Sequence, residues 1–281
     1  MKHLLPNYLI NKLVAEALAE DLNNTPDWTA NLISKDSTAK AIIKTNQDMV
    51  ICGIQFVETA LRQTTPDHKI SWLVNEGDSI KAGTQLCTIE GNARGLLTAE
   101  RTALNFLQTL SATATITREY VKAIANLDTQ IMDTRKTIPG LRYAQKYAVQ
   151  VGGGYNQRIG LFDGVLIKEN HIIAHGGIEA VLEHAFKITP AYIPIQIEVE
   201  NFTELKQAVA HGAKLILLDN MSTAEIFECV SYCKDKDVIL EVSGNVNLAN
   251  VKDYALCGVN RISIGSLTKN IQAIDLSMRF I

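Results

Sequence analysis

The second half of this chain alternates short apolar runs with amphipathic stretches, and no other feature of the sequence constrains the fold as strongly. The apolar runs lie at residues 131–134, 164–167, 193–199, 215–218, 238–242 and 261–264. Between them, apolar residues recur at helical spacing, as at Ile178, Val181, Leu182 and Ala185. Repeated strand–helix units predict parallel strands covered by helices. Because a complete barrel of this kind has eight strands, the six runs predict an incomplete or irregular (β/α) barrel.

The first part of the chain has a different pattern. Ile10, Val14 and Leu18 form part of the apolar stripe of an amphipathic helix, and residues 37–90 contain short β-rich runs separated by turns. Residues 98–125 then have the spacing of a long helix. We therefore predict an α/β protein with a mixed α/β domain over residues 1–112 and the barrel over residues 113–267.

The composition of the 281 residues argues against several classes of protein. A net charge of −3 gives no overall basic field for a nucleic acid or an anionic membrane. Polar residues interrupt every apolar run well before the roughly 20 residues of a membrane span, and no segment indicates export. The five cysteines lack CxxC spacing, as reduced thiols would. The sequence thus predicts a cytoplasmic, globular protein without a nucleic-acid or membrane partner.

Polar and charged residues gather where the predicted strands end. The carboxyl ends of the strands form the catalytic face of a (β/α) barrel, so these residues are candidates for an active site. They include Arg135-Lys136, Lys168, Glu198, Asp219-Asn220, Ser243-Gly244-Asn245 and Gly265-Ser266.

Cations gather between residues 135 and 168 and predict an anion-binding site. Arg135 and Lys136 follow one predicted strand, and Arg158 and Lys168 flank the next. Arg142 lies in a helical pattern, and we expect it on the surface.

Several separated motifs resemble one family. They are DTRKTIPG at residues 133–140, GGGYNQRIGLFDGVLIKEN at 152–170, IEVE at 197–200, LLDN at 217–220 and SGN at 243–245. In this order the motifs resemble the quinolinate phosphoribosyltransferases, also called nicotinate-nucleotide pyrophosphorylases (carboxylating), from about Leu9 to the C-terminus. One position departs from the family pattern, because Gln157 stands where a histidine is common before the arginine.

The resemblance implies an enzyme, a pentosyltransferase of de novo NAD synthesis. Such an enzyme transfers the phosphoribosyl group of phosphoribosyl pyrophosphate to quinolinate, and releases pyrophosphate, CO₂ and nicotinate mononucleotide. The family has an open, distorted barrel beside an N-terminal α/β domain. The resemblance further implies that the C-terminal segment, here residues 268–281, returns to that domain.

The two adjacent carboxylates of quinolinate suit arginine. A planar guanidinium group can bind a carboxylate with two parallel hydrogen bonds, and Arg101, Arg135 and Arg158 are the candidates. Lys136 and Lys168 would lie between the ring and the pyrophosphate, or beside a developing carbanion.

Two carboxylates complete the candidate site. Glu198 and Asp219 could bind the ribose hydroxyls, share a Mg²⁺ with the pyrophosphate and stabilise a positively charged transition state. With Lys136 and Lys168 they form the candidate catalytic set. The candidate substrate-binding residues are Arg101, Thr134, Arg135, Lys136, Gln157, Arg158, Lys168, Glu198, Asp219, Ser243, Gly244, Asn245, Ser263, Ile264 and Gly265.

Arg101 lies on the predicted long helix, away from the apolar side that includes Ala103, Leu107 and Leu110. An exposed arginine needs no partner. The resemblance, however, implies that this arginine is lent to the active site of a neighbouring subunit, and therefore a homodimer or a higher homo-oligomer.

Two other functions remain open from the sequence. A related phosphoribosyltransferase could act on another base, such as nicotinate, or the chain could be a molybdenum-transport relative. The turns in NEGDSIKAGTQL at residues 75–86 are similar to those of lipoyl and biotinyl carrier domains. A carrier needs its lysine at the tip of a tight turn, whereas Lys81 stands between Ile80 and Ala82, so we favour the enzyme.

Overall fold

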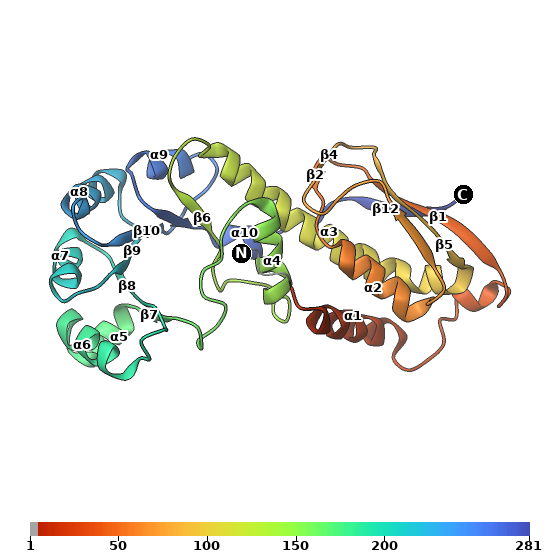
Figure 1. Cartoon of the computed structure of the whole chain (residues 1–281), viewed down its shortest axis with the longest axis horizontal. Helices are drawn as coiled ribbons and strands as arrows, with labels where there is room; N and C mark the ends of the chain where they lie inside the picture. The colour runs from red at the N-terminus through yellow and green to blue at the C-terminus, as the bar shows by residue number, and fades with distance from the viewer. Residues whose placement is uncertain (1–4) are drawn as a thin grey trace. The chain divides into compact units, whose positions relative to one another are not determined.

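The computed structural model describes residues 5–281, which form two compact units (Figure 1). The first unit contains the described residues up to Arg118 together with Tyr143–Gly153 and Asn270–Ile281, and the second contains Glu119–Arg142 and Gly154–Lys269. Compactness is not the same as independent folding, so the domain boundaries given by the sequence stay a prediction.

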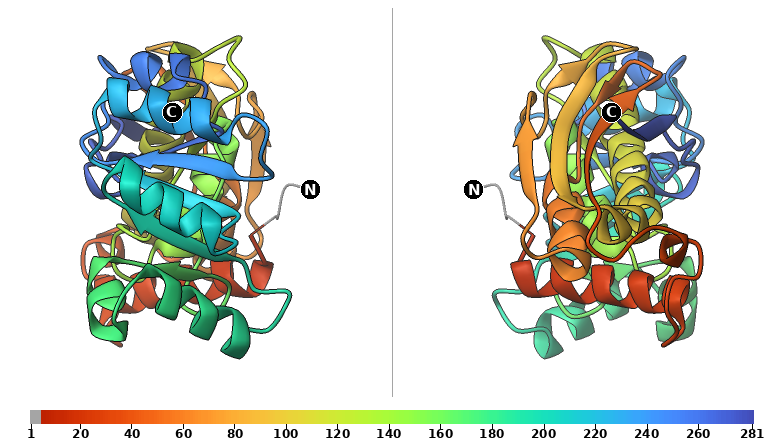
Figure 2. Two further views of the ribbon diagram at one scale, coloured as in Figure 1. Left: turned by 90° about the vertical axis from the view of Figure 1, so that its left-hand side faces the viewer. Right: turned by 90° about the vertical axis from the view of Figure 1, so that its right-hand side faces the viewer.

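The first unit is built on a four-stranded antiparallel sheet in the order β12-β1-β5-β3. Its strands are β1 (Thr38–Thr45), β3 (Lys69–Trp72), β5 (Gln85–Asn92) and β12 (Leu276–Phe280), and a small pair is formed by β2 (Met49–Val50) and β4 (Ser79–Ile80). The C-terminal strand β12 pairs with β1, with Ile43 opposite Met278 (Figure 2, right). The implied return of the C-terminal segment to the N-terminal region is therefore confirmed.

Helices accompany this sheet: α1 (Asn7–Leu22), the 3₁₀ turn η1 (Ala30–Leu32), α2 (Ile54–Thr64), α3 (Ala93–Ala123) and α4 (Arg142–Gly152). The expected stripe of α1 is buried at Ile10, Val14 and Leu18, because these residues share one face at helical spacing. Asn23, with a left-handed φ of 43°, ends the helix by donating its backbone N–H to Ala19 O.

The second unit contains six parallel strands in the order β6-β11-β10-β9-β8-β7. They are β6 (Gln130–Met132), β7 (Val165–Ile167), β8 (Ile195–Val199), β9 (Leu215–Asp219), β10 (Ile239–Ser243) and β11 (Arg261–Ser263). Each coincides with one of the apolar runs, so the six predicted strands are confirmed. In the described chain β6 and β7 are the two edges and do not pair with each other, so the barrel is open.

Helices between these strands cover one face of the sheet (Figures 1 and 2). They are α5 (Glu169–His175), α6 (Ile178–Ile188), α7 (Phe202–Ala210), α8 (Thr223–Cys233) and α9 (Val251–Leu256), and the short helix α10 (Ser266–Lys269) follows the last strand. The apolar faces of α6 and α7 are buried, as at Leu182 and Leu205. Ser222 and Glu225 begin α8 with a capping box, in which each side chain accepts the other residue's backbone N–H.

One segment lies against the open edge at β6. Tyr155 donates its backbone N–H to Ile131 O over 2.8 Å and accepts that of Asp133 over 3.1 Å, as a single parallel bridge. The chain continues from Tyr155 through Gln157 and Arg158 to β7 at the other edge. This segment therefore spans the opening of the barrel.

The cysteines and the helix lengths bear on the expectations from composition. All five cysteines are free, and burial raises the pKa of the Cys87 thiol to about 12, which disfavours the reactive thiolate. Among residues 5–281, no helix combines the length and the apolar character needed to cross a bilayer.

Candidate active site

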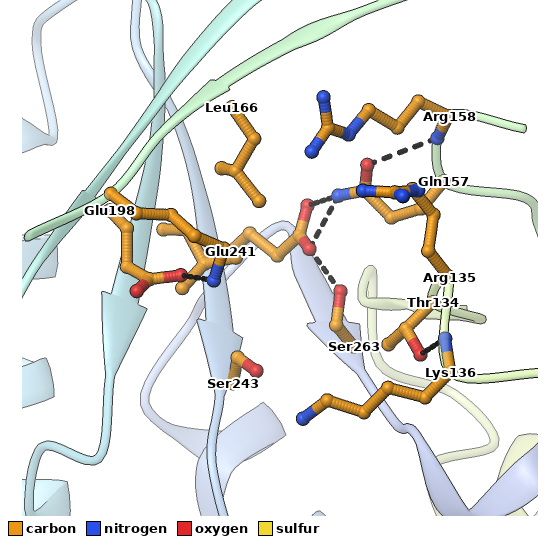
Figure 3. A pocket seen from close by; sticks show the side chains of 12 residues that line it. Thr134, Arg135, Lys136, Gln157, Arg158, Leu166, Glu198, Glu241, Ser243 and Ser263 are labelled. Carbon is orange, nitrogen blue, oxygen red and sulfur yellow. Dashed lines mark hydrogen bonds and ion pairs between the residues drawn. The ribbon is translucent and has the colours of Figure 1, made fainter. Parts of the chain in front are cut away.

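A cavity of about 300 Å³ lies in the second unit, where its strands end (Figure 3). Arginine, lysine and carboxylate side chains converge on it from β6, β7, β8 and β10 and from the loops beyond them. The lining residues are Thr134, Arg135, Lys136, Gln157, Arg158, Leu166, Lys168, Glu198, Leu217, Glu241, Ser243 and Ser263.

Most residues that the sequence singled out come together here. Five predicted residues do not line the cavity themselves, but each lies within two positions of a residue that does. They are Asp219, Gly244, Asn245, Ile264 and Gly265. The Ile264 backbone N–H already donates to Met132 O over 2.9 Å, so a phosphate would have to be bound by the N–H groups of neighbouring residues. Arg101 is exposed on α3, in the first unit, and does not line the cavity.

The segment after β6 presents Arg135 and Lys136. Thr134 Oγ1 accepts the Lys136 backbone N–H over 3.0 Å, and Thr268 Oγ1 donates to Lys136 O over 2.7 Å, so both ends of this turn are held. The Nε atom of Arg135 is buried and has no hydrogen-bond partner among the described residues. A buried guanidinium donor without a partner is costly unless an anion binds it.

The segment before β7 presents Gln157 and Arg158. The Gln157 backbone N–H donates to buried Asp133 over 2.9 Å, and Arg158 donates to Gly164 O over 2.8 Å. Burial and the nearby positive charge of Arg135 lower the pKa of Arg158 below its usual value, which Asp163 opposes. Two arginines that repel each other in one cavity form a site for an anion with two negative groups.

Glu241 is the main lining residue that the sequence analysis missed. It is fully buried on β10 and accepts hydrogen bonds from Gln157 Nε2 and from Ser263 Oγ (Figure 3). It also accepts one from Gln196 Nε2 over 3.1 Å. Strand alternation could have found it, because Glu241 lies two residues before Ser243 and therefore on the same face. Gln157 thus serves as a neutral donor to a buried carboxylate.

Lys168 and Glu198 form an ion pair of 2.7 Å at the cavity. The Glu198 side chain is only 14% exposed, whereas that of Lys168 is 48% exposed. Glu198 lies opposite Leu217, and Leu217 lies opposite Glu241, in the ladders of β8, β9 and β10. Both carboxylates therefore occupy one level of the sheet, separated by an apolar side chain.

Asp219 ends β9 and receives a hydrogen bond of 2.7 Å from Asn220 Nδ2. Burial and the negative charge of Glu198 raise the pKa of Asp219, while Lys168, the Asn220 hydrogen bond and Lys136 oppose this. The neighbouring turn requires glycine at position 244, where φ is +101° and a Cβ would lie 2.2 Å from Asn220 Oδ1.

Glu198 and Asp219 are the carboxylates that could hold a divalent cation. Within residues 5–281, no group of three or more His, Cys, Asp or Glu side chains is arranged to hold a metal alone. Mg²⁺ is commonly bound by one or two carboxylates together with substrate phosphates. The hard oxygen donors of these two residues fit such a shared site and do not fit a complete protein cage.

Arg142 is not a free surface residue, and the expectation from its helical pattern is wrong. It is half-buried and donates to Thr137 Oγ1, Ile159 O and Arg135 O. A helical pattern cannot reveal acceptors that the fold brings from other segments.

An open parallel α/β barrel that gathers arginines, lysines and carboxylates at its strand ends defines an enzyme class that binds small polyanionic substrates. Two family models narrow this class: the quinolinate phosphoribosyl transferase N-terminal domain matches residues 27–111, and the C-terminal domain matches residues 113–279. The chain belongs to the quinolinate phosphoribosyltransferase family.

Individual relatives match over nearly their whole lengths. A probable nicotinate-nucleotide pyrophosphorylase (carboxylating) from Synechocystis is 36% identical, covering 100% of this chain and 96% of the relative. That of Bacillus subtilis is 34% identical and covers 96% of this chain and 92% of its own. The solved nicotinate-nucleotide pyrophosphorylase from Francisella tularensis is 44% identical, with a TM-score of 0.95, over 100% of this chain and 99% of the other.

Proposed function

We propose that this chain transfers the phosphoribosyl group of phosphoribosyl pyrophosphate to quinolinate and removes the 2-carboxylate, giving nicotinate mononucleotide for NAD synthesis. Family membership over nearly the whole chain supports the reaction. The observation that carries the substrate is the pair Arg135 and Arg158, whose positive charges face one cavity, while the buried Nε of Arg135 has no partner within residues 5–281.

Arg135 and Arg158 bind the two carboxylates of quinolinate in this proposal. Each guanidinium group can form two parallel hydrogen bonds to one carboxylate, and the negative charges relieve the repulsion between the arginines. A monocarboxylate such as nicotinate would leave one half-buried guanidinium group unpaired, so the site rejects it.

Lys136 and Lys168 act as point charges toward the pyrophosphate. Lys168 is held by Glu198 at 2.7 Å, and incoming phosphate oxygens would compete with that carboxylate for the ammonium group. Glu198 would then be free for a ribose hydroxyl. Backbone N–H groups of the Ser243-Gly244-Asn245 turn and of Gly265 are proposed to bind the 5′-phosphate.

The reaction has two steps. First, the lone pair of the ring nitrogen forms a bond to the anomeric carbon while the carbon–oxygen bond breaks and its electron pair leaves with pyrophosphate. Glu198 and Asp219 stabilise the positive charge that develops on the sugar. A Mg²⁺ held by these two carboxylates and the phosphates would neutralise the leaving group.

In the second step the bond between ring carbon 2 and its carboxylate breaks, and CO₂ leaves. The electron pair remains on carbon 2, where the adjacent positive nitrogen stabilises it, and carbon 2 then takes up one proton. Lys136 or Lys168 is the proposed charge beside this carbanion. Gln157 cannot supply the proton, because an amide does not titrate near neutral pH.

The assembly and location of the protein belong to the same proposal. We infer a cytoplasmic homodimer, or a higher homo-oligomer, in which the exposed Arg101 of one subunit completes the site of its neighbour. Activity should then fall when dilution separates the subunits. Full activity of a monomer would remove Arg101 from the site.

Parallel incubations with phosphoribosyl pyrophosphate and Mg²⁺ test the substrate. The proposal predicts turnover of quinolinate, inhibition by phthalate, which carries the same two carboxylates without the ring nitrogen, and no turnover of nicotinate. Turnover of nicotinate, or of neither base, would show that the substrate is wrong although the fold is right.

A further inference from the structure

The two arginines of the cavity come from segments on either side of the opening in the barrel. Arg135 follows the edge strand β6, and Arg158 precedes the other edge strand, β7. Within the described residues these strands do not pair with each other, so no backbone ladder between them sets the spacing of the arginines. A single backbone bridge at Tyr155 joins the two segments before either arginine is reached, so side chains that tie the segments further along can set that spacing.

Arg142 makes such a tie with three of its donors. Nε donates to Thr137 Oγ1 over 3.1 Å and one terminal nitrogen donates to Arg135 O over 3.4 Å, both on the first segment. The other terminal nitrogen donates to Ile159 O over 3.1 Å, on the second segment and next to Arg158. One planar group thus contacts the backbone of Arg135 and the residue after Arg158.

Other contacts hold the two segments at other positions, among them the backbone bridge of Tyr155 to the end of β6. Asp163 accepts the backbone N–H groups of Ile159 and Gly160, both over 2.8 Å, within the second segment. Asp133 accepts the Gln157 backbone N–H over 2.9 Å and joins the second segment to the end of β6. Arg142 connects the two segments further along the chain. It contacts the first segment at Arg135 and the second at Ile159, which follows Arg158.

We propose that Arg142 is a positioning residue that sets the distance between Arg135 and Arg158 and thereby the affinity for quinolinate. Arg142 does not line the cavity, so it acts through the two arginines that do. This inference rests on the proposed function. Lysine cannot replace it, because one ammonium group lacks the planar fork that reaches three acceptors at once.

The test compares Arg142→Lys with Arg118→Lys. Arg118 is a matched control because it also donates to two backbone carbonyls, Gly152 O over 2.8 Å and Val151 O over 3.0 Å, but within the first unit. For Arg142→Lys we expect the KM for quinolinate to rise about tenfold, with kcat and the KM for phosphoribosyl pyrophosphate changed less than about threefold. Arg118→Lys should change neither KM.

A purely structural role would give a different result. Partial unfolding lowers the active fraction, and hence kcat, without a selective change in the KM for one substrate. An Arg142→Lys enzyme whose KM for quinolinate matches that of Arg118→Lys would overturn the inference. If Arg142→Lys does not fold, Thr137→Val, which removes only the Nε acceptor, should raise the same KM about two- to threefold, and an unchanged KM would overturn it equally.

Phthalate binding separates this inference from the proposed reaction. Calorimetry should show phthalate binding to the wild-type protein and about tenfold weaker binding to Arg142→Lys than to Arg118→Lys. If the wild type binds phthalate but does not turn over quinolinate, the reaction is wrong and the affinities still decide the role of Arg142. Absence of phthalate binding to the wild type would overturn both.

Discussion

The two sides of the cavity are built in different ways. Glu198 and Glu241 lie on strands inside the sheet, opposite the same residue of β9, so the ladders between the strands fix their positions. Arg135 follows one edge strand and Arg158 precedes the other, on segments that one backbone bridge at Tyr155 and several side-chain hydrogen bonds hold together. The comparison indicates that the carboxylate side is fixed by the fold, whereas the arginine side can adjust to its ligand.

Substitution on the arginine side should change binding without changing the fold. Arg135→Lys removes the fork that binds one carboxylate, so we expect the KM for quinolinate to rise about a hundredfold, or about 2.7 kcal/mol. Steady-state kinetics with thermal unfolding would measure both effects. An unchanged KM would remove Arg135 from the site and would contradict the claim that the arginine side of the cavity binds the substrate.

Substitution inside the sheet should mainly reduce stability. Glu241→Gln places an amide NH₂ against the donors of Gln157 and Gln196, and we expect a loss of about 2 kcal/mol in the free energy of unfolding. Denaturant unfolding would measure it. Glu198→Gln is the control, since its carboxylate has a lysine partner at the cavity, and equal losses for the two variants would contradict the difference between them.

The raised pKa of Asp219, on the carboxylate side of the cavity, predicts a pH dependence of stability. Because this pKa is raised by burial and by Glu198, the folded state takes up the proton at a higher pH than the unfolded state does. The free energy of unfolding should therefore increase as pH falls through the raised pKa. Asp219→Asn should flatten that dependence and lower kcat/KM about tenfold at neutral pH. A pH dependence identical to the wild type would exclude Asp219 as its source.

Gln157 joins the two sides, and its substitution should have the smallest effect. A histidine at this position could still donate to Glu241, so we expect Gln157→His to keep kcat/KM within about tenfold, or about 1.4 kcal/mol. Kinetics across neutral pH would check this, because histidine titrates there. A larger fall would show that the cavity is built around the glutamine.

The carboxylate side of the cavity, which lies on the strands, was more predictable from the sequence than the arginine side. The six strands were predictable, because a buried parallel strand is a short apolar run, and the residues that end β8 and β9 were predictable with them. Glu241 was accessible in principle from alternation along β10, but a carboxylate inside an apolar run gives no sign that Gln157 and Ser263 will satisfy it.

The arginine side was less predictable for a physical reason. Arg142 follows a helical pattern whose spacing predicts a surface position, while its acceptors include Ile159 O, which is 17 residues away in the sequence. Local spacing cannot encode such a contact. The strand count predicted an incomplete or irregular barrel, but not the position of its opening between β6 and β7 or the segment from Tyr155 onward that spans it.

The fate of the 2-carboxylate tests the central claim most directly. Quinolinate labelled with ¹³C in that group would be incubated with the protein, phosphoribosyl pyrophosphate and Mg²⁺, and labelled CO₂ and nicotinate mononucleotide would be measured together. We predict that they form in equal amounts and only when the dicarboxylate is supplied. A nucleotide product that keeps the label, or one formed from nicotinate instead, would contradict the account.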